Sequence, residues 1–214
     1  MDSKRNKKIV NFIGQFRTYS LLDLAVLLVA IKTPMLIFIG AILLHLGFIA
    51  FLENQHKHSY REQMPAWVWM VLTILGVVFY RNAWMFGFIL FGYLYTNKNK
   101  KNIGLFAPLI RGLQCMFLIA GITGFGSVFP LFVLVLMFVR NFLGDVRDVK
   151  KDKQENQKTL PILMKFNTNK NYKYIHLFGV IGTTIVWWLF SSTPAIFLFA
   201  VILLETLTYD LTSR

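Results

Sequence analysis

Apolar stretches recur along most of this chain, and each is bounded by a cluster of Lys, Arg and Asn or by a Pro or Gly break. Hydrophobic residues make up 56% of the sequence, whereas soluble globular domains contain roughly 45–50%. Lipid offers no hydrogen-bond partner to open backbone groups, so segments of this kind cross a bilayer as helices. The sequence therefore predicts an all-α fold, a polytopic transmembrane helical bundle that forms a single membrane domain over residues 1–214.

The pattern predicts about eight membrane spans. Several are shorter than the roughly 20 residues that a perpendicular helix needs, so these helices would extend into the interface or lie where the bilayer is thin. In residues 1–18, apolar positions at helical spacing stand among basic ones, which indicates a cytoplasmic, interfacial amphipathic segment. The expected spans are 16–31, 35–52, 65–80, 83–96, 103–123, 125–143, 174–190 and 193–209.

The positions of the positive charges predict the orientation of these spans. With eight spans, both termini and the loops at 53–64, 97–102 and 144–173 share one side, which together with Arg140 at the adjoining span end carries 20 of the 23 Lys and Arg residues. Because cytoplasmic loops are rich in Lys and Arg, we expect a multi-pass protein of a bacterial or archaeal plasma membrane with both termini cytoplasmic. The net charge of +13 favours anionic membrane lipids as partners. We expect no nucleic-acid partner, because the basic residues are spread over several loops without a binding motif.

One acidic run indicates chemistry. Asp145, Asp148 and Asp152 stand at i, i+3 and i+7, a spacing that a helix places on one face. The run follows the apolar stretch 125–143 and so lies at the edge of the membrane. Adjacent carboxylates repel one another unless a cation holds them, which predicts a Mg²⁺ site and, with it, a phosphorylated substrate. The alternative is a solvated charge run in which the acids are mixed with lysines.

The residues after this run carry a resemblance to a known family. The D-x2-D-x3-D spacing, the turn residue Asn156 and T-L-P at 159–161 resemble the second aspartate motif of the UbiA superfamily of intramembrane prenyltransferases. The family usually has Gly at the position of Asn156, and both residues tolerate a left-handed turn. The resemblance implies a UbiA-like fold, of which this chain would be a short, divergent member. It also implies that Asp145, Asp148 and Asp152 are catalytic residues and magnesium ligands.

The same resemblance places a first motif at the cytoplasmic end of the second span. The family has N-D-x2-D-x3-D there, and this chain has Asn54, His58 and Glu62 at the matching spacing, with Gln55 in place of the first Asp. Asn54 and Glu62 are expected oxygen ligands of a second Mg²⁺. His58 is also a candidate metal ligand, although a neutral imidazole suits Zn²⁺ and other transition metals better. An ordinary polar loop is the alternative interpretation.

Basic and amide side chains near these motifs are candidate ligands of a diphosphate. Tyr95-Thr96 and the lysines that follow resemble a third family segment, Y-S/T-x3-K, in which Lys100 would neutralise phosphate charge. Lysines in this loop also fit a role as anchors at the cytoplasmic interface, and Arg147 and Lys158 also fit structural neutralisation of the acids. The candidates are Asn54, Arg61, Lys98, Lys100, Lys101, Arg147 and Lys158.

Polar residues inside the apolar spans form a separate group. Asp23 and Glu205 lie within spans, where an ionisable side chain is costly and indicates function by default. For His45 we expect packing or a hydrogen bond between helices. The lone Cys115 cannot form a disulfide within the chain, and its position within a span predicts a buried thiol.

The resemblance implies a reaction as well as a site. A Mg²⁺-dependent intramembrane prenyltransferase would move a prenyl group from prenyl diphosphate to an aromatic or lipid acceptor and release pyrophosphate, with metal ions and a lysine stabilising the departing charge. Two alternatives stay open. One is a UbiA-like terpene synthase or cyclase acting on prenyl diphosphate alone, and the other is a non-catalytic membrane relative that binds lipid or a partner.

Overall fold

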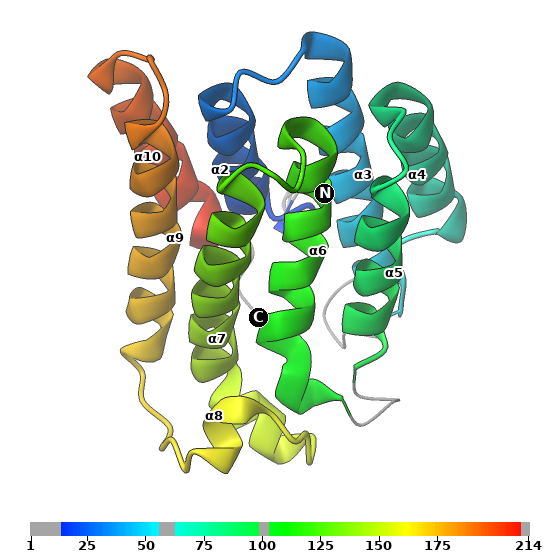
Figure 1. Cartoon of the computed structure of the whole chain (residues 1–214). Helices are drawn as coiled ribbons and strands as arrows, with labels where there is room; N and C mark the ends of the chain where they lie inside the picture. The colour runs from blue at the N-terminus through cyan, green and yellow to red at the C-terminus, as the bar shows by residue number, and fades with distance from the viewer. Residues whose placement is uncertain (1–13, 56–62, 99–102, 211–214) are drawn as a thin grey trace, which may run out of the picture. The chain divides into compact units, whose positions relative to one another are not determined.

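The computed structural model describes residues 14–55, 63–98 and 103–210 (Figure 1). Within these ranges the chain is helical and contains no β-strand. Each of the expected spans coincides with a helix, and the ends agree to within a few residues except that the helix Phe129–Gln154 continues well beyond residue 143. The residue contacts divide the chain into two compact units, Met1–Arg81 with Thr184–Arg214, and Asn82–Thr183.

Proline marks where the helices begin. A helix tolerates proline at its start because the first-turn N–H groups have no acceptor within the helix, so the missing N–H of proline is not needed there. All six prolines of the sequence stand immediately before a helix or in its first turn. They are Pro34, Pro65, Pro108, Pro130, Pro161 and Pro194. Their positions therefore predict where these helices begin.

The first unit contains α2 (Thr18–Ala30), α3 (Met35–Gln55), α4 (Ala66–Tyr80), the second part of α9 (Tyr172–Leu189) and α10 (Ala195–Tyr209). Helix α3 packs along α4, and α2 contacts both α3 and α10. Glycines allow the α3–α4 contact. A Cβ on Gly40 would lie 2.5 Å from the backbone nitrogen of Tyr80, and one on Gly76 would lie 2.8 Å from the Leu44 side chain. Small residues at helix interfaces permit the close approach from which packing in lipid gains its stability.

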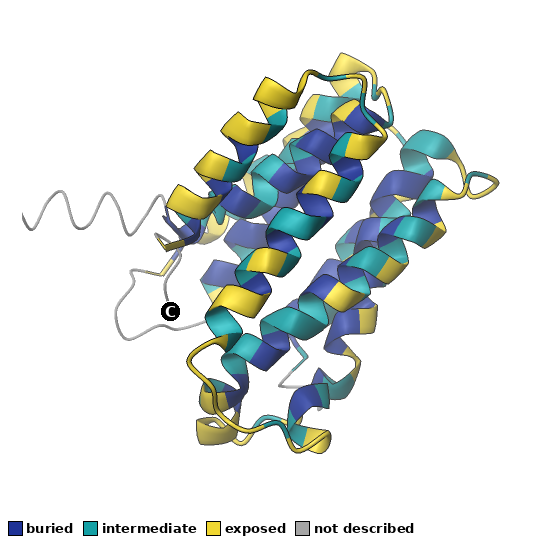
Figure 2. Ribbon diagram, turned by 90° about the vertical axis from the view of Figure 1, so that its left-hand side faces the viewer, coloured by how far each residue is buried: buried dark blue, intermediate teal, exposed yellow. Residues whose placement is uncertain are grey.

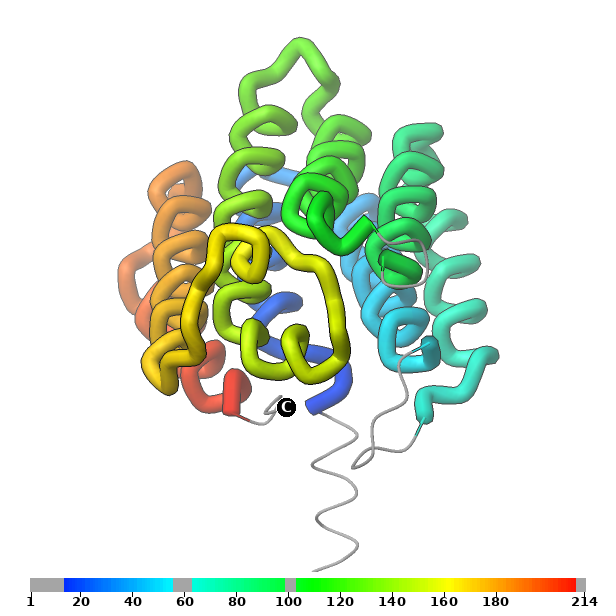
Figure 3. Tube along the Cα trace, turned by 90° about the horizontal axis from the view of Figure 1, so that it is seen from below, coloured from blue at the N-terminus to red at the C-terminus, as the bar shows by residue number. Residues whose placement is uncertain are grey.

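The second unit contains α5 (Met85–Thr96), the 3-10 turn η1 (Gly104–Phe106), α6 (Ala107–Thr123), α7 (Phe129–Gln154), the short α8 (Leu160–Leu163) and the first part of α9. Helix α6 lies between α5 and α7 (Figure 1), and a Cβ on Gly112 of α6 would lie 2.7 Å from the carbonyl oxygen of Leu134 on α7. After α7 the chain turns back, and α8 contacts both α7 and η1 (Figure 3). The residues that follow α7 therefore lie near η1, at the start of α6.

Helix α7 is longer than the span predicted for it. The helix continues beyond the apolar stretch to Gln154, through the first part of the segment 144–173 that the sequence analysis assigns to the cytoplasmic side. The added residues include no Pro, and Lys151 pairs with Glu155 at i, i+4 with 3.8 Å between Nζ and Oε1. The chain turns out of the helix at Asn156, whose φ of 53° confirms the expected left-handed turn.

Among the residues that the structure describes, three helical segments are long and apolar enough to cross a membrane: Met35–Gln55, Gly104–Thr123 and Phe129–Gln154. Other apolar helices, among them α2, α4, α5 and α10, are shorter. Large apolar side chains stay exposed in stripes that repeat every three or four residues along single helices (Figure 2). Apolar surfaces of this extent mark contact with lipid or with another protein. The stripes include Trp67, Val71, Ile74 and Val78 on α4, and Ile196, Phe199, Leu203 and Leu207 on α10.

Candidate functional site

The aspartate run forms part of α7, as the spacing predicts. Asp145 and Asp152 are buried, with 7% and 6% of their surface exposed, and Asp148 is half-buried. The three positions share one face of the helix because they lie one and two turns apart. This face therefore holds carboxylates that are largely removed from solvent, which makes any positive group beside them important.

Lys98, which follows α5, supplies such a positive group. Its Nζ lies 3.6 Å from Asp145 Oδ1 and 4.8 Å from the centre of the Tyr95 ring. Burial lowers the pKa of Lys98, but its interactions with Tyr95 and with the three aspartates of α7 outweigh this effect and hold the pKa above its ordinary value. The ammonium group stays charged and neutralises part of the acidic face. Two segments that the sequence analysis assigned to one site thus meet in the structure.

One of the two buried carboxylates is not fully satisfied, and the other has a perturbed pKa. Asp145 Oδ2 is buried and has no hydrogen-bond donor among the described residues. Burial raises the pKa of Asp152 to about 6; Lys98 opposes this shift, while the charges of Asp145 and Asp148 add to it. A buried acceptor without a donor costs free energy, so a cation or a donor group brought by a ligand would be stabilised at this face.

Arg147 neutralises the third aspartate. Its Nε and Nη2 donate to the two carboxylate oxygens of Asp148, each at 2.8 Å, in a bidentate pair. Its Nη1 lies 3.2 Å from Nδ1 of His176, a buried residue of α9. Because a guanidinium only donates, His176 Nδ1 must be the acceptor, and the imidazole is therefore neutral with its proton on Nε2.

No pattern in the sequence marks His176 as a site residue. It lies among apolar and aromatic residues in the sequence, far from the aspartate run, and no spacing links the two. Arg147 and His176 meet because α9, which contains His176, lies beside α7, which contains Arg147. We call Lys98, Asp145, Arg147, Asp148 and Asp152 together the α7 site.

Magnesium is the cofactor that the sequence implies for this site. No group of three or more His, Cys, Asp or Glu side chains is arranged to hold a metal ion within the described ranges. The chemistry of Asp145 and Asp152 nevertheless fits Mg²⁺, which commonly binds through one or two carboxylates and takes its remaining oxygens from phosphate and water. The unsatisfied Oδ2 of Asp145 is an acceptor that such an ion would use. The residues therefore fit an ion that binds together with a phosphorylated ligand.

Asn54, the candidate from the first motif, lies near the end of α3 in the first unit. Its Nδ2 donates to the carbonyl oxygen of Met64 at 2.7 Å, and its Oδ1 accepts from Gln55 Nε2 at 3.0 Å. The amide thus ties the end of α3 to the segment before α4. Lys158 is exposed in the second unit. The remaining candidates lie outside the described residues, and their roles stay predictions; they are His58, Arg61, Glu62, Lys100 and Lys101.

A second buried polar cluster lies in the first unit, among residues of the apolar spans. Thr184 Oγ1 lies 2.6 Å from Glu205 Oε1 and 3.3 Å from Asp23 Oδ1, and all three residues are buried. These contacts link α2, α9 and α10. Ser20 Oγ lies 3.1 Å from Nε2 of His45, which confirms the expected hydrogen bond between helices. The burial of Cys115 is confirmed as well, in the second unit.

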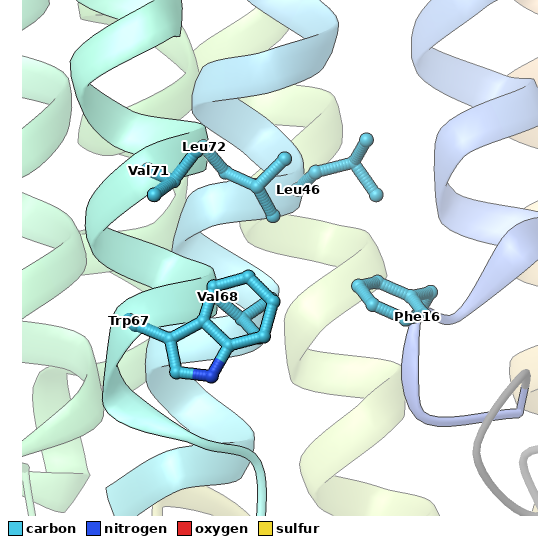
Figure 4. A pocket seen from close by; sticks show the side chains of 6 residues that line it. All are labelled: Phe16, Leu46, Trp67, Val68, Val71 and Leu72. Atoms are coloured by element: carbon cyan, nitrogen blue, oxygen red, sulfur yellow. The ribbon is translucent and has the colours of Figure 1, made fainter.

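An apolar groove of about 400 Å³ is also present in the first unit. Figure 4 shows the Phe16 ring on one side of it and side chains of α4 on the other. The lining contains no titratable side chain, so the groove suits an acyl or prenyl chain better than a reacting group. The lining residues are Phe16, Leu46, Trp67, Val68, Val71 and Leu72.

The chain was compared with protein-family models, with curated proteins and with solved structures, and none of them matches. What the chain can do chemically follows from the α7 site. There, carboxylates, an ammonium and a guanidinium lie close enough together to bind a divalent cation and an anionic ligand side by side.

Proposed function

We propose that this chain is an integral membrane, Mg²⁺-dependent prenyltransferase of the UbiA type. It would transfer a prenyl group from prenyl diphosphate to a small or lipid acceptor and release pyrophosphate. The contact between Lys98 and Asp145, 3.6 Å from Nζ to Oδ1, carries the proposal, because it joins two segments that the resemblance assigns to one diphosphate site. The helices that are long and apolar enough to cross a membrane support the location in the bilayer.

The α7 site has the charges that this reaction requires. Asp145 and Asp152 would hold Mg²⁺, which when bound supplies positive charge to the departing diphosphate. Lys98 would donate to a phosphate oxygen, and Arg147 has the planar fork that pairs with phosphate through two hydrogen bonds. Donors aimed at the leaving group favour the transition state because negative charge develops there. The prenyl tail would lie among the apolar helices, where the exclusion of water protects an allylic cation from hydrolysis.

The experiment follows pyrophosphate release by mass spectrometry. Purified protein in lipid nanodiscs is incubated with Mg²⁺ and prenyl diphosphates of several chain lengths, with and without a membrane-lipid extract. Release that depends on the extract supports transfer, whereas release without it supports the terpene synthase alternative. Asp148→Asn should abolish release, and Glu155→Gln, an exposed acid at the end of the same helix, should retain it. Equal release by both variants would contradict the site assignment.

A non-catalytic role is the second candidate, and one observation favours it. Both carboxylate oxygens of Asp148 accept from Arg147, so the charge of this aspartate is already neutralised and its attraction for Mg²⁺ is weakened. A protein that only binds the ligand would show Mg²⁺-dependent binding of prenyl diphosphates without any release of pyrophosphate. The same incubations, combined with a binding measurement, separate this candidate from the enzyme.

A further inference from the structure

Arg147 is held at three of its nitrogen atoms. Two of them bind Asp148, and the third binds the imidazole of His176 at 3.2 Å. The guanidinium takes one lone pair of each Asp148 oxygen, and its positive charge repels a metal ion that approaches the lone pairs that are left. If Asp148 is to join Asp145 and Asp152 as the third magnesium ligand that the resemblance implies, Arg147 must move away from it.

We propose that Arg147 is a movable cation of the α7 site, and that His176 is the positioning residue that holds it against Asp148 until a metal and a diphosphate bind. This inference rests on the proposed function and concerns how the same site is regulated. A phosphate group is the natural new partner of Arg147, because guanidinium and phosphate match in geometry and charge.

The surroundings of His176 fit this role. The residue is buried, and a Cβ on Gly144 would lie 3.4 Å from its Nε2, so the ring is confined close to α7. Gly144 and Arg147 are three residues apart and share a face of the helix. A neutral imidazole restrains the guanidinium through one hydrogen bond and contributes no opposing charge. The restraint is therefore strong enough to select a position and weak enough for a phosphate to replace.

The two ion pairs of the site make the binding of metal and diphosphate interdependent. A diphosphate that drew Lys98 and Arg147 away on its own would leave the buried Asp145 without its cation, which is strongly unfavourable. A metal ion alone would displace Lys98 and Arg147 from the carboxylates and leave these two positive charges close to its own. When both bind together, each acid meets the metal and each base meets a phosphate, so every charge keeps a partner.

The test uses the full chain in detergent micelles and isothermal titration with MgCl₂ and methylenediphosphonate, each alone and both together. For the wild type we expect saturating Mg²⁺ to tighten diphosphonate binding by at least about tenfold, about the size of one hydrogen bond to a charged group. His176→Leu removes the acceptor and should tighten joint binding by about tenfold, because the resting position of Arg147 loses its support. His176→Asn restores an acceptor and should bind within about twofold of the wild type.

Three results would overturn the proposal. The first is equal affinity for diphosphonate with and without Mg²⁺, and the second is weaker joint binding by His176→Leu, the direction expected if the residue only supports the fold. Protection of Cys115 from alkylation reports whether each variant is folded, since this thiol is buried in the same unit. If His176→Leu does not fold, Arg147→Lys replaces it; lysine lacks the fork, so coupling between the ligands should fall below about threefold. Unchanged coupling in Arg147→Lys would be the third such result.

The titration also separates this inference from the proposed function, because it uses no prenyl group and measures no turnover. Coupled binding without pyrophosphate release from any prenyl diphosphate would sink the prenyltransferase alone. Pyrophosphate release without coupled binding would sink the movable role of Arg147 alone.

Discussion

The pair of Lys98 and Asp145 provides the sharpest quantitative prediction. At 3.6 Å between Nζ and Oδ1, with an effective dielectric constant of about 20, the Coulomb attraction is about 5 kcal/mol before desolvation is counted. Removing one partner of a buried pair typically costs about 3–5 kcal/mol, because the other charge is left uncompensated. We expect Lys98→Met to lower the free energy of unfolding by about 3 kcal/mol, the low end of that range, because Asp145 can take up a proton when its partner is removed.

A double-mutant cycle isolates the interaction from the other effects of each change. Asp145→Asn leaves no charge for Lys98→Met to strand, so the double variant should lose less than the sum of the single losses. We expect a coupling free energy of about 2 kcal/mol, within the range measured for contacting residues.

The native Cys115 reports this energy directly. It is a buried, free thiol on α6, in the same unit as the pair. Its alkylation by a maleimide requires the unit to open, so the labelling rate follows the free energy of opening when opening and closing are fast. A coupling free energy of about 2 kcal/mol corresponds to a factor of about 30 in labelling rate. The double variant should label about 30 times more slowly than the product of the two single-variant rate increases predicts.

The exposed Lys150, on the same helix as Asp145, is the matched control. Lys150→Met removes a solvated charge and should change the labelling rate by less than about threefold. The reasoning is refuted if the effects of Lys98→Met and Asp145→Asn simply multiply, because the two side chains would then contribute independently.

Three further predictions concern other parts of the chain. Gly40→Ala places a Cβ 2.5 Å from the backbone of α4 and should lower the free energy of unfolding in detergent by about 1–3 kcal/mol. Gly182→Ala, whose Cβ would meet nothing within 4 Å, should be neutral or stabilising. Equal losses of stability in both variants would contradict the close α3–α4 contact. The pKa of Asp152 is about 6 in the folded state against an ordinary 3.8, so the folded state binds this proton more tightly and the contribution of Asp152 to stability falls as the pH rises from 3.8 to 6. Asp152→Asn should therefore reduce the dependence of the free energy of unfolding on pH over this range, measured in unfolding curves recorded with a chelator. An unchanged pH dependence would count against the shift. Thr184→Val removes the hydroxyl between two buried acids and should cost about 1–3 kcal/mol. Thr183→Val, whose hydroxyl bonds its own helix, should cost much less, and similar losses would contradict the cluster.

Much of the helical architecture could be predicted because its causes are local. Apolar runs bounded by proline mark where helices begin, and the structure places a helix at each expected position. The extension of α7 could not be found from hydropathy, because the apolar stretch ends near residue 143 while residues that favour a helix continue to Gln154. Asn156 is an intermediate case, since the need for a left-handed turn follows from its place after the helix.

The candidate site was predicted less completely, because its contacts depend on tertiary packing. The spacing of the three aspartates indicates their common helix face. The resemblance indicates Lys100, with Lys98 or Lys101 as substitutes, and the structure places Lys98 beside Asp145. Nothing in the sequence spacing connects Arg147 with His176, since that contact exists only where α9 packs against α7. From the sequence, Arg147 could neutralise the acids or bind diphosphate, and the structure shows it paired with Asp148.

The central claim, that the α7 site binds a divalent cation together with a diphosphate, can be measured directly by electron paramagnetic resonance. Mn²⁺ replaces Mg²⁺, and a prenyl thiodiphosphate serves as a slowly reacting ligand in nanodiscs. The wild type should show a tightly bound Mn²⁺ signal that requires the ligand and disappears in Asp145→Asn. An identical bound signal in wild type and Asp145→Asn, or no ligand-dependent signal in either, would contradict the account.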